Sequence, residues 1–272
     1  MNRHRARRTV VTAVLASLAV LAAVVGIAWP RVHTALSVGT ALERTQEPRP
    51  WSAAVVPAPV PARTDAASPT PTPAFDLTRY STSDPSSPWV VVNKQHPLPA
   101  EHVPPDLVDV EGVQLRQVAA ADVAAMLAAA RAEGVALELR SGYRSYSDQA
   151  AARAAIEARR GFAHAERYSA RPGHSEHQTG LAVDVDSGST PSCNLQTCFA
   201  TTPEGVWVAQ RAAEFGLLVR YTEENTAVTG YAPEGWHLRW VGRELTGWMT
   251  ANGVTSLEDA FGVTGGPEYA GG

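Results

Sequence analysis

The chain has 272 residues, of which 44% are hydrophobic and 18% are charged, and it contains only two cysteines. This composition excludes a wholly disordered chain and a small disulfide scaffold. The formal net charge is −4, and four arginines in residues 1–8 leave the rest of the chain more acidic still. Nucleic acid is therefore disfavoured as a partner, because binding a phosphate backbone needs a surplus of positive charge.

Residues 9–29 form an uncharged, mostly apolar run directly after the basic segment 1–8. A helix of this length spans about 30 Å, the thickness of the hydrocarbon core of a bilayer. We therefore predict a transmembrane anchor, with a cleaved signal peptide as the alternative. Because arginines precede the run, residues 1–8 are expected in the cytoplasm and the chain after residue 30 outside it. The predicted location is the cell membrane, with a single pass, or the exterior if the segment is cleaved.

Residues 30–88 have the composition of an extended linker. Half of the chain's 20 prolines lie between residues 31 and 88, against a single glycine, Gly39. Proline-rich segments of this kind favour extended, polyproline-like conformations and cannot bury a core. The sequence therefore predicts a tether that holds the folded part of the chain away from the membrane.

A globular pattern runs from residue 89 to residue 255. Apolar residues at helical spacing predict helices, and alternating apolar residues predict strands. The expected helices are 118–133, 147–160, 203–215 and 243–251, and the expected strands are 135–140, 181–186, 217–221 and 236–241. Since helices and short strands interleave, we predict one α+β domain. The C-terminal tail, 256–272, is expected to be disordered from Gly262 onward.

The two cysteines, Cys193 and Cys198, lie in a loop between a predicted strand and a predicted helix. Outside the cytoplasm, this spacing in a chain with no other thiol favours a local disulfide. A zinc knuckle would need two more ligands nearby, and a nucleophilic cysteine would need a defined histidine partner. Neither pattern is visible.

Three polar residues have the chemistry of a hydrolytic zinc site. Such a site uses three protein ligands and leaves the fourth position for water. His177 and Asp184 fall on a loop and the strand that follows it, and His237 falls on a later strand. Glu234, three residues before His237, is then placed to take a proton from the water. On spacing alone, His174 competes with His177 and Asp186 competes with Asp184.

Three blocks of the sequence combine glycine, histidine and acidic residues: SGYRSYSDQ (141–149), PGHSEHQTGLAVDVD (172–186) and EGWHLRWVG (234–242). Together they resemble the D-alanyl-D-alanine carboxypeptidases of the VanY type, zinc enzymes of the wider D-Ala-D-Ala metallopeptidase and Hedgehog-like fold. The blocks occur in the order typical of that family, and the segments NKQHPLP (93–99) and VPPDLV (103–108) resemble the part of the family that precedes them. The resemblance implies a zinc-peptidase domain with a central, mostly antiparallel sheet flanked by helices.

The resemblance also implies a role for individual residues. Its S-x-H-x2-G-x-A-x-D pattern makes His177 and Asp184 zinc ligands, and its E-x-W-H pattern makes His237 the third ligand and Glu234 the general base. The arginine of its S-G-Y-R block is Arg144, which would contact the scissile carbonyl or the developing oxyanion. The candidates for holding the terminal carboxylate or the peptide backbone are Ser141, Gln149 and Ser175.

The implied activity is that of a zinc-dependent D,D-carboxypeptidase with one Zn²⁺, which removes the terminal D-alanine from peptidoglycan stem peptides. We expect a monomer. An L,D-carboxypeptidase or D,D-dipeptidase of the same family, or a non-catalytic zinc-stabilised wall-binding module, is the alternative. A serine D,D-peptidase is excluded, because it needs S-x-x-K, and the only lysine, Lys94, has Val91 three residues before it.

Overall fold

The computed structural model describes residues 75–271. The predicted segments 1–8 and 9–29, and the predicted linker up to residue 74, lie outside the described residues. Between residues 75 and 271, no helix combines the length and the apolar character that a bilayer crossing requires.

Four antiparallel strands form the central sheet, in the order β3-β4-β6-β5. Their bounds are Leu137–Ser141 for β3, Ala182–Ser187 for β4, Leu217–Tyr221 for β5 and Glu234–Trp240 for β6. Each coincides with a predicted strand to within two residues. Strand β6 begins two residues before the predicted strand 236–241, so the candidate base Glu234 is its first residue.

A separate hairpin precedes the sheet and was not predicted from the sequence. It pairs β1 (Leu107–Val110) with β2 (Val113–Arg116). The chain reverses at Glu111 and Gly112, whose φ angles are both positive, 52° and 86°. Positive φ at both central residues is what a two-residue type I′ turn requires, and such turns match the twist of the strands they join.

The helices follow the predicted periodicity with local differences. Ser145, not Ser147, caps α2, since its Oγ accepts a hydrogen bond from the backbone N–H of Asp148. The predicted helix 203–215 divides at Ala212 into an α-helix and a 3₁₀ turn, and three short helices, α3, α5 and α7, were not predicted. The helices are α1 (Gln117–Ala132), α2 (Tyr146–Arg160), α3 (Phe162–Tyr168), α4 (Pro203–Arg211), α5 (Thr226–Thr229), α6 (Arg243–Asn252) and α7 (Leu257–Phe261). The 3₁₀ turns are η1 (Glu176–Thr179), η2 (Pro191–Cys193), η3 (Thr197–Thr201) and η4 (Ala212–Phe215).

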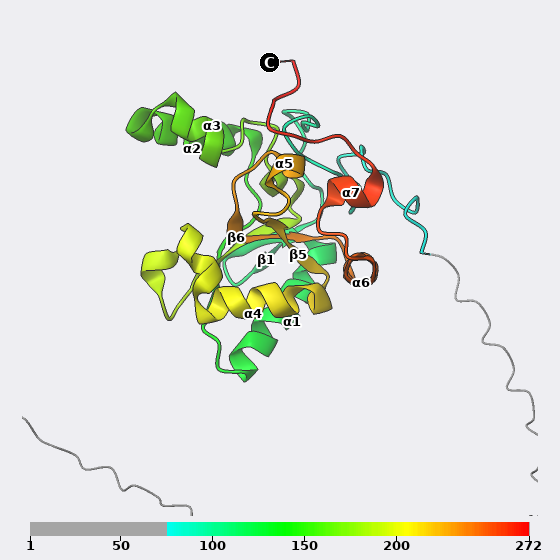
Figure 1. The fold of residues 1–272 in the computed structure, drawn as a ribbon, viewed down its shortest axis with the longest axis vertical. Coiled ribbons are helices and arrows are strands. Elements are labelled where there is room, and N and C mark those ends of the chain that lie inside the picture. Colours follow the sequence, from blue (N-terminus) through cyan, green and yellow to red (C-terminus); the bar gives the residue numbers. More distant parts are fainter. Residues whose placement is uncertain (1–74, 272) are drawn as a thin grey trace, which may run out of the picture. The chain divides into compact units, whose positions relative to one another are not determined.

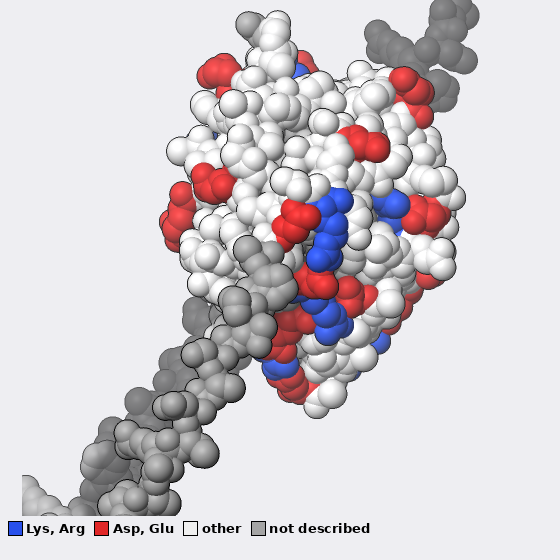
Figure 2. Space-filling model, turned by 90° about the vertical axis from the view of Figure 1, so that its right-hand side faces the viewer, with Lys and Arg blue, Asp and Glu red and all other residues white. Residues whose placement is uncertain are grey.

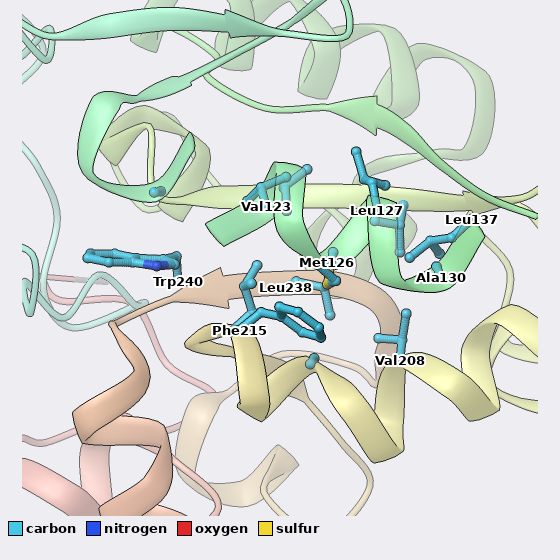
Figure 3. Packing of buried hydrophobic residues seen from close by; sticks show 14 of the residues in the cluster. Val123, Met126, Leu127, Ala130, Leu137, Val208, Phe215, Leu238 and Trp240 are labelled. Carbon is cyan, nitrogen blue, oxygen red and sulfur yellow. The ribbon is translucent and has the colours of Figure 1, made fainter. Parts of the chain in front are cut away.

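The main apolar core lies between one face of the sheet and the helices α1 and α4, with η4 continuing α4. Figure 1 shows α1 and α4 on one side of the strands, and the α2–α3 pair and α5 on the other. Figure 3 shows Met126 and Leu127 of α1 in the same buried apolar cluster as Leu238 of β6. These three side chains are fully buried. Burial of this apolar surface is the main favourable contribution to folding.

Strand β6 separates this core from a polar interior. Leu238 and Trp240 join the apolar core, whereas the alternating residues His237 and Arg239 contact buried carboxylates on the opposite side. Successive side chains of a strand point to opposite faces of its sheet. The same seven-residue strand therefore contributes to the core and presents polar groups on the face turned away from α1 and α4.

The folded unit extends beyond both predicted boundaries. Before residue 89, the ring of Phe75 stacks on Trp248 and lies against Trp89, with ring centroids 5.9 Å away in each case. In the tail, Tyr269 is buried, and its hydroxyl accepts a hydrogen bond from the backbone N–H of Arg171. The predicted disorder after Gly262 is thus not observed up to residue 271. Phe75 and Leu77 before residue 89, and Val263 and Tyr269 in the tail, bury apolar surface that holds these segments on the domain.

Candidate metal centre

The register of the central sheet brings distant polar residues into one row. Asp184 on β4 pairs with His237 on β6 and with Ser141 on β3. Side chains of directly paired residues lie on the same face of a sheet and within contact distance. Two of the three predicted zinc ligands are therefore neighbours because of strand pairing, although 53 positions separate them in the sequence.

The third predicted ligand, His177, reaches this row from the turn that precedes β4. It lies in η1, which ends at Gly180 with φ of 67°. A Cβ at position 180 would lie 3.0 Å from both Arg116 Cγ and Leu107 Cδ2. Glycine thus permits both the left-handed backbone and the close approach to the hairpin.

The three side chains converge. One potential ligand atom from each of His177, Asp184 and His237 lies within 4.8 Å of the others. All three residues are buried, and the two imidazole ring centroids are 5.0 Å apart. Two ring nitrogens and one carboxylate from different parts of the chain therefore meet at one point, as the sequence predicted.

In each of the two imidazoles, one ring nitrogen faces Asp184 and the other faces a hydrogen-bond acceptor on the far side of the ring. That second contact orients the ring. His177 Nδ1 lies 2.7 Å from the carbonyl oxygen of Gly142, so Nε2 faces Asp184 at 3.1 Å. His237 Nε2 lies 3.2 Å from a carboxylate oxygen of Glu176, so Nδ1 faces Asp184 at 3.0 Å. Such outer partners fix the tautomer and the ring plane of histidine ligands. Each ring can therefore offer a lone pair toward the centre.

The donor set fits a zinc ion. Two neutral imidazole nitrogens and one carboxylate are ligands that zinc accepts, and three protein ligands leave a position for water or substrate. The acceptors behind both rings, Gly142 O and the Glu176 carboxylate, complete the arrangement that metal-bound histidines have. Ser141 Oγ also donates to Asp184 Oδ2 at 2.6 Å, which fixes the plane of that carboxylate.

Buried charge shifts the pKa of each group in this centre. Burial opposes ionisation of Asp184, yet the facing His177 and His237 hold its pKa well below the usual value. Burial likewise opposes the charged form of His237, but hydrogen bonds to Asp184 and Glu176 raise its pKa to about 9. The pKa of His177 is lowered, chiefly by burial, although Asp184 opposes the shift. Asp184 therefore stays ionised despite its burial and can serve as an anionic ligand for a cation.

Glu234 and Arg144 line the same cleft as the three candidate ligands. Burial raises the pKa of Glu234 to about 7, with His237 opposing the shift, and a pKa near neutrality suits a general base. The backbone N–H of Arg144 donates to His177 O, which ties the arginine to the ligand turn. Its Nε is buried and has no hydrogen-bond partner within residues 75–271. The guanidinium is therefore available to a ligand in the cleft.

The two competing ligands are held elsewhere. His174 Nδ1 contacts the carbonyl oxygen of Asn93 at 2.9 Å, and its ring meets Tyr269 edge-on. Asp186 accepts a hydrogen bond from Arg140 at 2.9 Å. The geometry thus selects His177 and Asp184 from the alternatives that spacing alone left open.

The predicted substrate-binding residues differ in their surroundings. Gln149 and Ser175 line the cleft. Gln149 donates through Nε2 to the carbonyl oxygen of Ala170, and its buried Oε1 has no partner in the described chain. Ser141 donates to Asp184 and is absent from the cleft lining. The position of Ser141 fits a residue that orients the candidate ligand Asp184. A contact between Ser141 and substrate stays a prediction.

Sequence reasoning missed the buried ionic cluster behind His237. Glu176 accepts hydrogen bonds through Oε1 from Arg220 and Arg239, and all three side chains are essentially inaccessible to solvent. The pKa of Glu176 is held far below its ordinary value, because both arginines outweigh the effect of burial. The signal in the sequence was the strand alternation, since Arg239 lies two residues after His237 on the same face.

The centre opens into a cleft of about 620 Å³. On one side it is lined by α2 and α3, including Arg159, Arg160 and Tyr168, and on the other by residues 195–197. The latter belong to the loop closed by the predicted disulfide between Cys193 and Cys198, which is present with a Cα–Cα distance of 5.3 Å. The cleft is thus large enough for a short peptide.

Comparison with known proteins identifies related sequences. The family model for VanY, D-alanyl-D-alanine carboxypeptidase, matches residues 112–243. YodJ of Bacillus subtilis, provisionally named a carboxypeptidase, is 38% identical over 188 residues, which are 65% of this chain and 68% of that protein. A D-alanyl-D-alanine carboxypeptidase of Enterococcus faecalis is 33% identical over 57% of this chain and 59% of its own length.

Solved structures have the same fold. The LdcB LD-carboxypeptidase matches with a TM-score of 0.60 and 35% identity, covering 66% of this chain and 88% of that chain. A vancomycin resistance D,D-pentapeptidase VanY, solved in complex with Zn(II), matches with a TM-score of 0.54 and 31% identity, covering 63% of this chain and 97% of that chain.

Proposed function

The chain belongs to the VanY family of D-alanyl-D-alanine carboxypeptidases and is a zinc metallo-carboxypeptidase of that type, and from this premise we propose that it removes the terminal D-alanine from peptidoglycan stem peptides as a D,D-carboxypeptidase. The observation that carries the proposal is the convergence of His177, Asp184 and His237 in a cleft that Glu234 and Arg144 also line. We propose that the three converging side chains hold one zinc ion.

The proposed roles follow from the chemistry of each group. A zinc ion at this position would polarise the attacking water and the scissile carbonyl. Glu234 takes the proton from that water and delivers it to the departing amine, for which its raised pKa is suited. Arg144 donates a hydrogen bond to the carbonyl oxygen as negative charge develops on it, since its guanidinium stays charged and its Nε has no partner within residues 75–271.

The substrate-binding proposal rests on the shape and polarity of the cleft. The C-terminal residue of the peptide lies near Gln149 and Ser175, and the rest of the peptide follows the cleft between α2 and the disulfide loop. The orphaned Oε1 of Gln149 is a hydrogen-bond acceptor for a peptide N–H. A buried acceptor without a partner is costly unless a ligand or water supplies one.

An L,D-carboxypeptidase is the second candidate for the same chemistry. The observation that favours it is the structural similarity to the LdcB LD-carboxypeptidase, with a TM-score of 0.60. A D,D-dipeptidase and a non-catalytic wall-binding module are the remaining alternatives. The presence of Glu234 beside the candidate ligands argues against the non-catalytic module, since a binding module has no use for a base.

We propose that the enzyme works outside the cytoplasm, anchored by residues 9–29 and tethered by the proline-rich segment. The Cys193–Cys198 disulfide supports an oxidising compartment. On the face of the domain in Figure 2, acidic and basic side chains are interspersed, with no broad basic patch. A mixed, net acidic surface without a broad basic patch is compatible with a protein that takes peptides and not nucleic acid as its ligand.

Mass spectrometry of defined stem peptides tests the proposal. The full-length chain is incubated with pentapeptide and tetrapeptide stems, with and without a chelator. The D,D activity predicts loss of one residue from the pentapeptide, abolished by the chelator. Cleavage of the tetrapeptide alone would favour the L,D activity, and release of a dipeptide would favour the dipeptidase.

A substitution tests the catalytic centre within that assay. Glu234→Ala is expected to lower kcat/KM by about 10²- to 10⁴-fold, the usual contribution of a general base, while zinc stays bound. Glu223→Ala, at an exposed carboxylate outside the cleft lining, is the matched control. Unchanged cleavage by a zinc-loaded Glu234→Ala variant would refute the enzymatic proposal.

A further inference from the structure

We propose that Glu176 is a positioning residue that holds His237 with Nδ1 toward the metal position, and that the buried arginines behind it keep Glu176 in place. This inference rests on the proposed zinc site. It concerns a residue adjacent to the ligand His177 in sequence, whose side chain acts on the other histidine.

The geometry at the ring of His237 supports this role. Its two nitrogens face two different carboxylates: Nδ1 lies 3.0 Å from Asp184 Oδ1, and Nε2 lies 3.2 Å from Glu176 Oε2. A neutral imidazole carries its proton on one nitrogen only, and a carboxylate can only accept. When the ring binds a metal through Nδ1, its remaining proton is on Nε2 and is donated to Glu176. Glu176 therefore selects the tautomer whose lone pair faces the centre.

The plane of the ring is fixed from a third direction. The ring of Tyr221 stacks on His237, with centroids 5.0 Å apart and an interplanar angle of 17°. This contact prevents tilting but cannot distinguish the two ring nitrogens. The choice between them is left to the hydrogen-bond partners at the ring edge, of which Glu176 is the one on the outer side.

Glu176 is itself immobilised by charge. Its second oxygen, Oε1, accepts hydrogen bonds from Arg220 Nε at 2.9 Å and from Arg239 Nη1 at 3.1 Å. Arg220 also donates to both carboxylate oxygens of Glu258 on α7, at 2.9 Å and 2.7 Å. Arg239 donates further to the carbonyl oxygen of Val90. These fully buried bonds link the ligand turn, two strands of the sheet and the C-terminal helix.

An amide is a poor substitute for the Glu176 carboxylate, because Oε1 accepts from two arginines and Oε2 accepts from His237. In Glu176→Gln, an NH₂ group placed at Oε1 would meet two guanidinium donors. Placed at Oε2, it would meet His237 Nε2 as a second donor, which favours the tautomer with the proton on Nδ1. Either orientation weakens the presentation of Nδ1 to the metal.

Zinc affinity, measured by chelator competition on the full chain, is the decisive readout. Removing the outer partner of a metal-bound histidine lowers metal affinity by about 10- to 100-fold, and this is the effect expected for Glu176→Gln. Glu258→Gln is the matched control, because it removes a carboxylate from the same arginine without touching His237. It is expected to lower thermal stability and to leave the zinc Kd near that of the unchanged protein.

The comparison separates positioning from folding. An equal loss of zinc affinity in both variants, or no loss in Glu176→Gln, would overturn the proposal. If Glu176→Gln does not fold, Glu176→Asp retains the charge beside the arginines and withdraws the carboxylate from His237 by one methylene group. A weaker zinc Kd than that of Glu258→Gln is then the supporting result.

A spectroscopic measurement tests the same point without any substitution. Nitrogen NMR of the zinc-loaded protein should show the His237 proton on Nε2 and the metal on Nδ1, and the reverse assignment would refute the proposal. If the unchanged protein binds zinc in this way but cleaves no stem peptide, the proposed function fails while the role of Glu176 stands.

Discussion

The two faces of the central sheet are built by different physical means from the same strands. On β6, Leu238 enters an apolar core against α1, and its neighbour His237 enters a polar interior where its two ring nitrogens face two carboxylates. Apolar burial is non-directional and depends on volume. Buried hydrogen bonds between charged groups depend on the position of individual atoms.

This difference predicts which substitutions each face tolerates. The apolar face should respond to lost volume with lost stability and little change in chemistry. The polar face should respond to a changed atom with lost metal binding or activity. Four measurements test this contrast, in order of decreasing expected effect.

The largest effect is expected from His237→Ala. Loss of one of three candidate ligands should lower zinc affinity and reduce kcat/KM by about 10³-fold or more, since the site then lacks the donor set that activates water. Stem-peptide cleavage and chelator competition measure the two quantities. A variant that retains both would show that the polar face does not form the metal site.

The adjacent substitution, Leu238→Ala, should have the opposite profile. Its side chain is fully buried, and truncating a buried leucine costs about 2–5 kcal/mol of unfolding free energy through lost contacts and a cavity. Urea denaturation measures the loss. The folded variant should bind zinc as the unchanged protein does, and a large drop in affinity would show that the two faces are not separable.

Replacing both Cys193 and Cys198 by serine should have a moderate effect. The disulfide closes a short loop, for which chain entropy predicts about 2 kcal/mol of stabilisation. Because residues 195–197 line the cleft, KM for a stem peptide should rise while kcat changes little. Denaturation and steady-state kinetics on the double variant test both statements. Unchanged stability and KM would exclude a role of the loop in the cleft.

The smallest effect, taken per pH unit, is the change of zinc affinity with pH. The pKa of His237 in the zinc-free protein is raised to about 9, so below that value the ring carries a proton that a metal must displace. Zinc affinity should therefore rise with pH, by about tenfold per unit, and level off near pH 9. Chelator competition between pH 6.5 and 9 measures the slope. An affinity independent of pH would contradict the ionic pairing on the polar face.

Local sequence patterns predicted most of the regular structure. Helix α1 and strands β3 to β6 follow from apolar periodicity, because each element must present one apolar side to a core. The hairpin at Leu107–Arg116 was missed, since a Glu-Gly turn is a weaker signal than Asn-Gly. The ordered ends were missed because Phe75 and Tyr269 are isolated aromatic residues in segments of non-folding composition.

The candidate site was predicted partly by residue type and partly by resemblance. His177, Asp184, His237, Glu234 and the disulfide could be named because zinc sites and short thiol loops restrict residue types. The choice of His177 over His174 was left open by spacing. The structure decides this choice. His177 contacts the carbonyl oxygen of Gly142 through one ring nitrogen and faces Asp184 with the other, whereas His174 contacts the carbonyl oxygen of Asn93.

The sequence by itself determined the alternation of β6 and the kinds of donor available for a metal, because side-chain direction in a strand and ligand chemistry are local properties. Only the tertiary structure decided that Asp184 pairs with His237, and that Glu176 lies between His237 and two buried arginines. Strand register and the burial of opposite charges depend on residues that are distant in the chain. Their energies are defined only when the fold has removed water from between them.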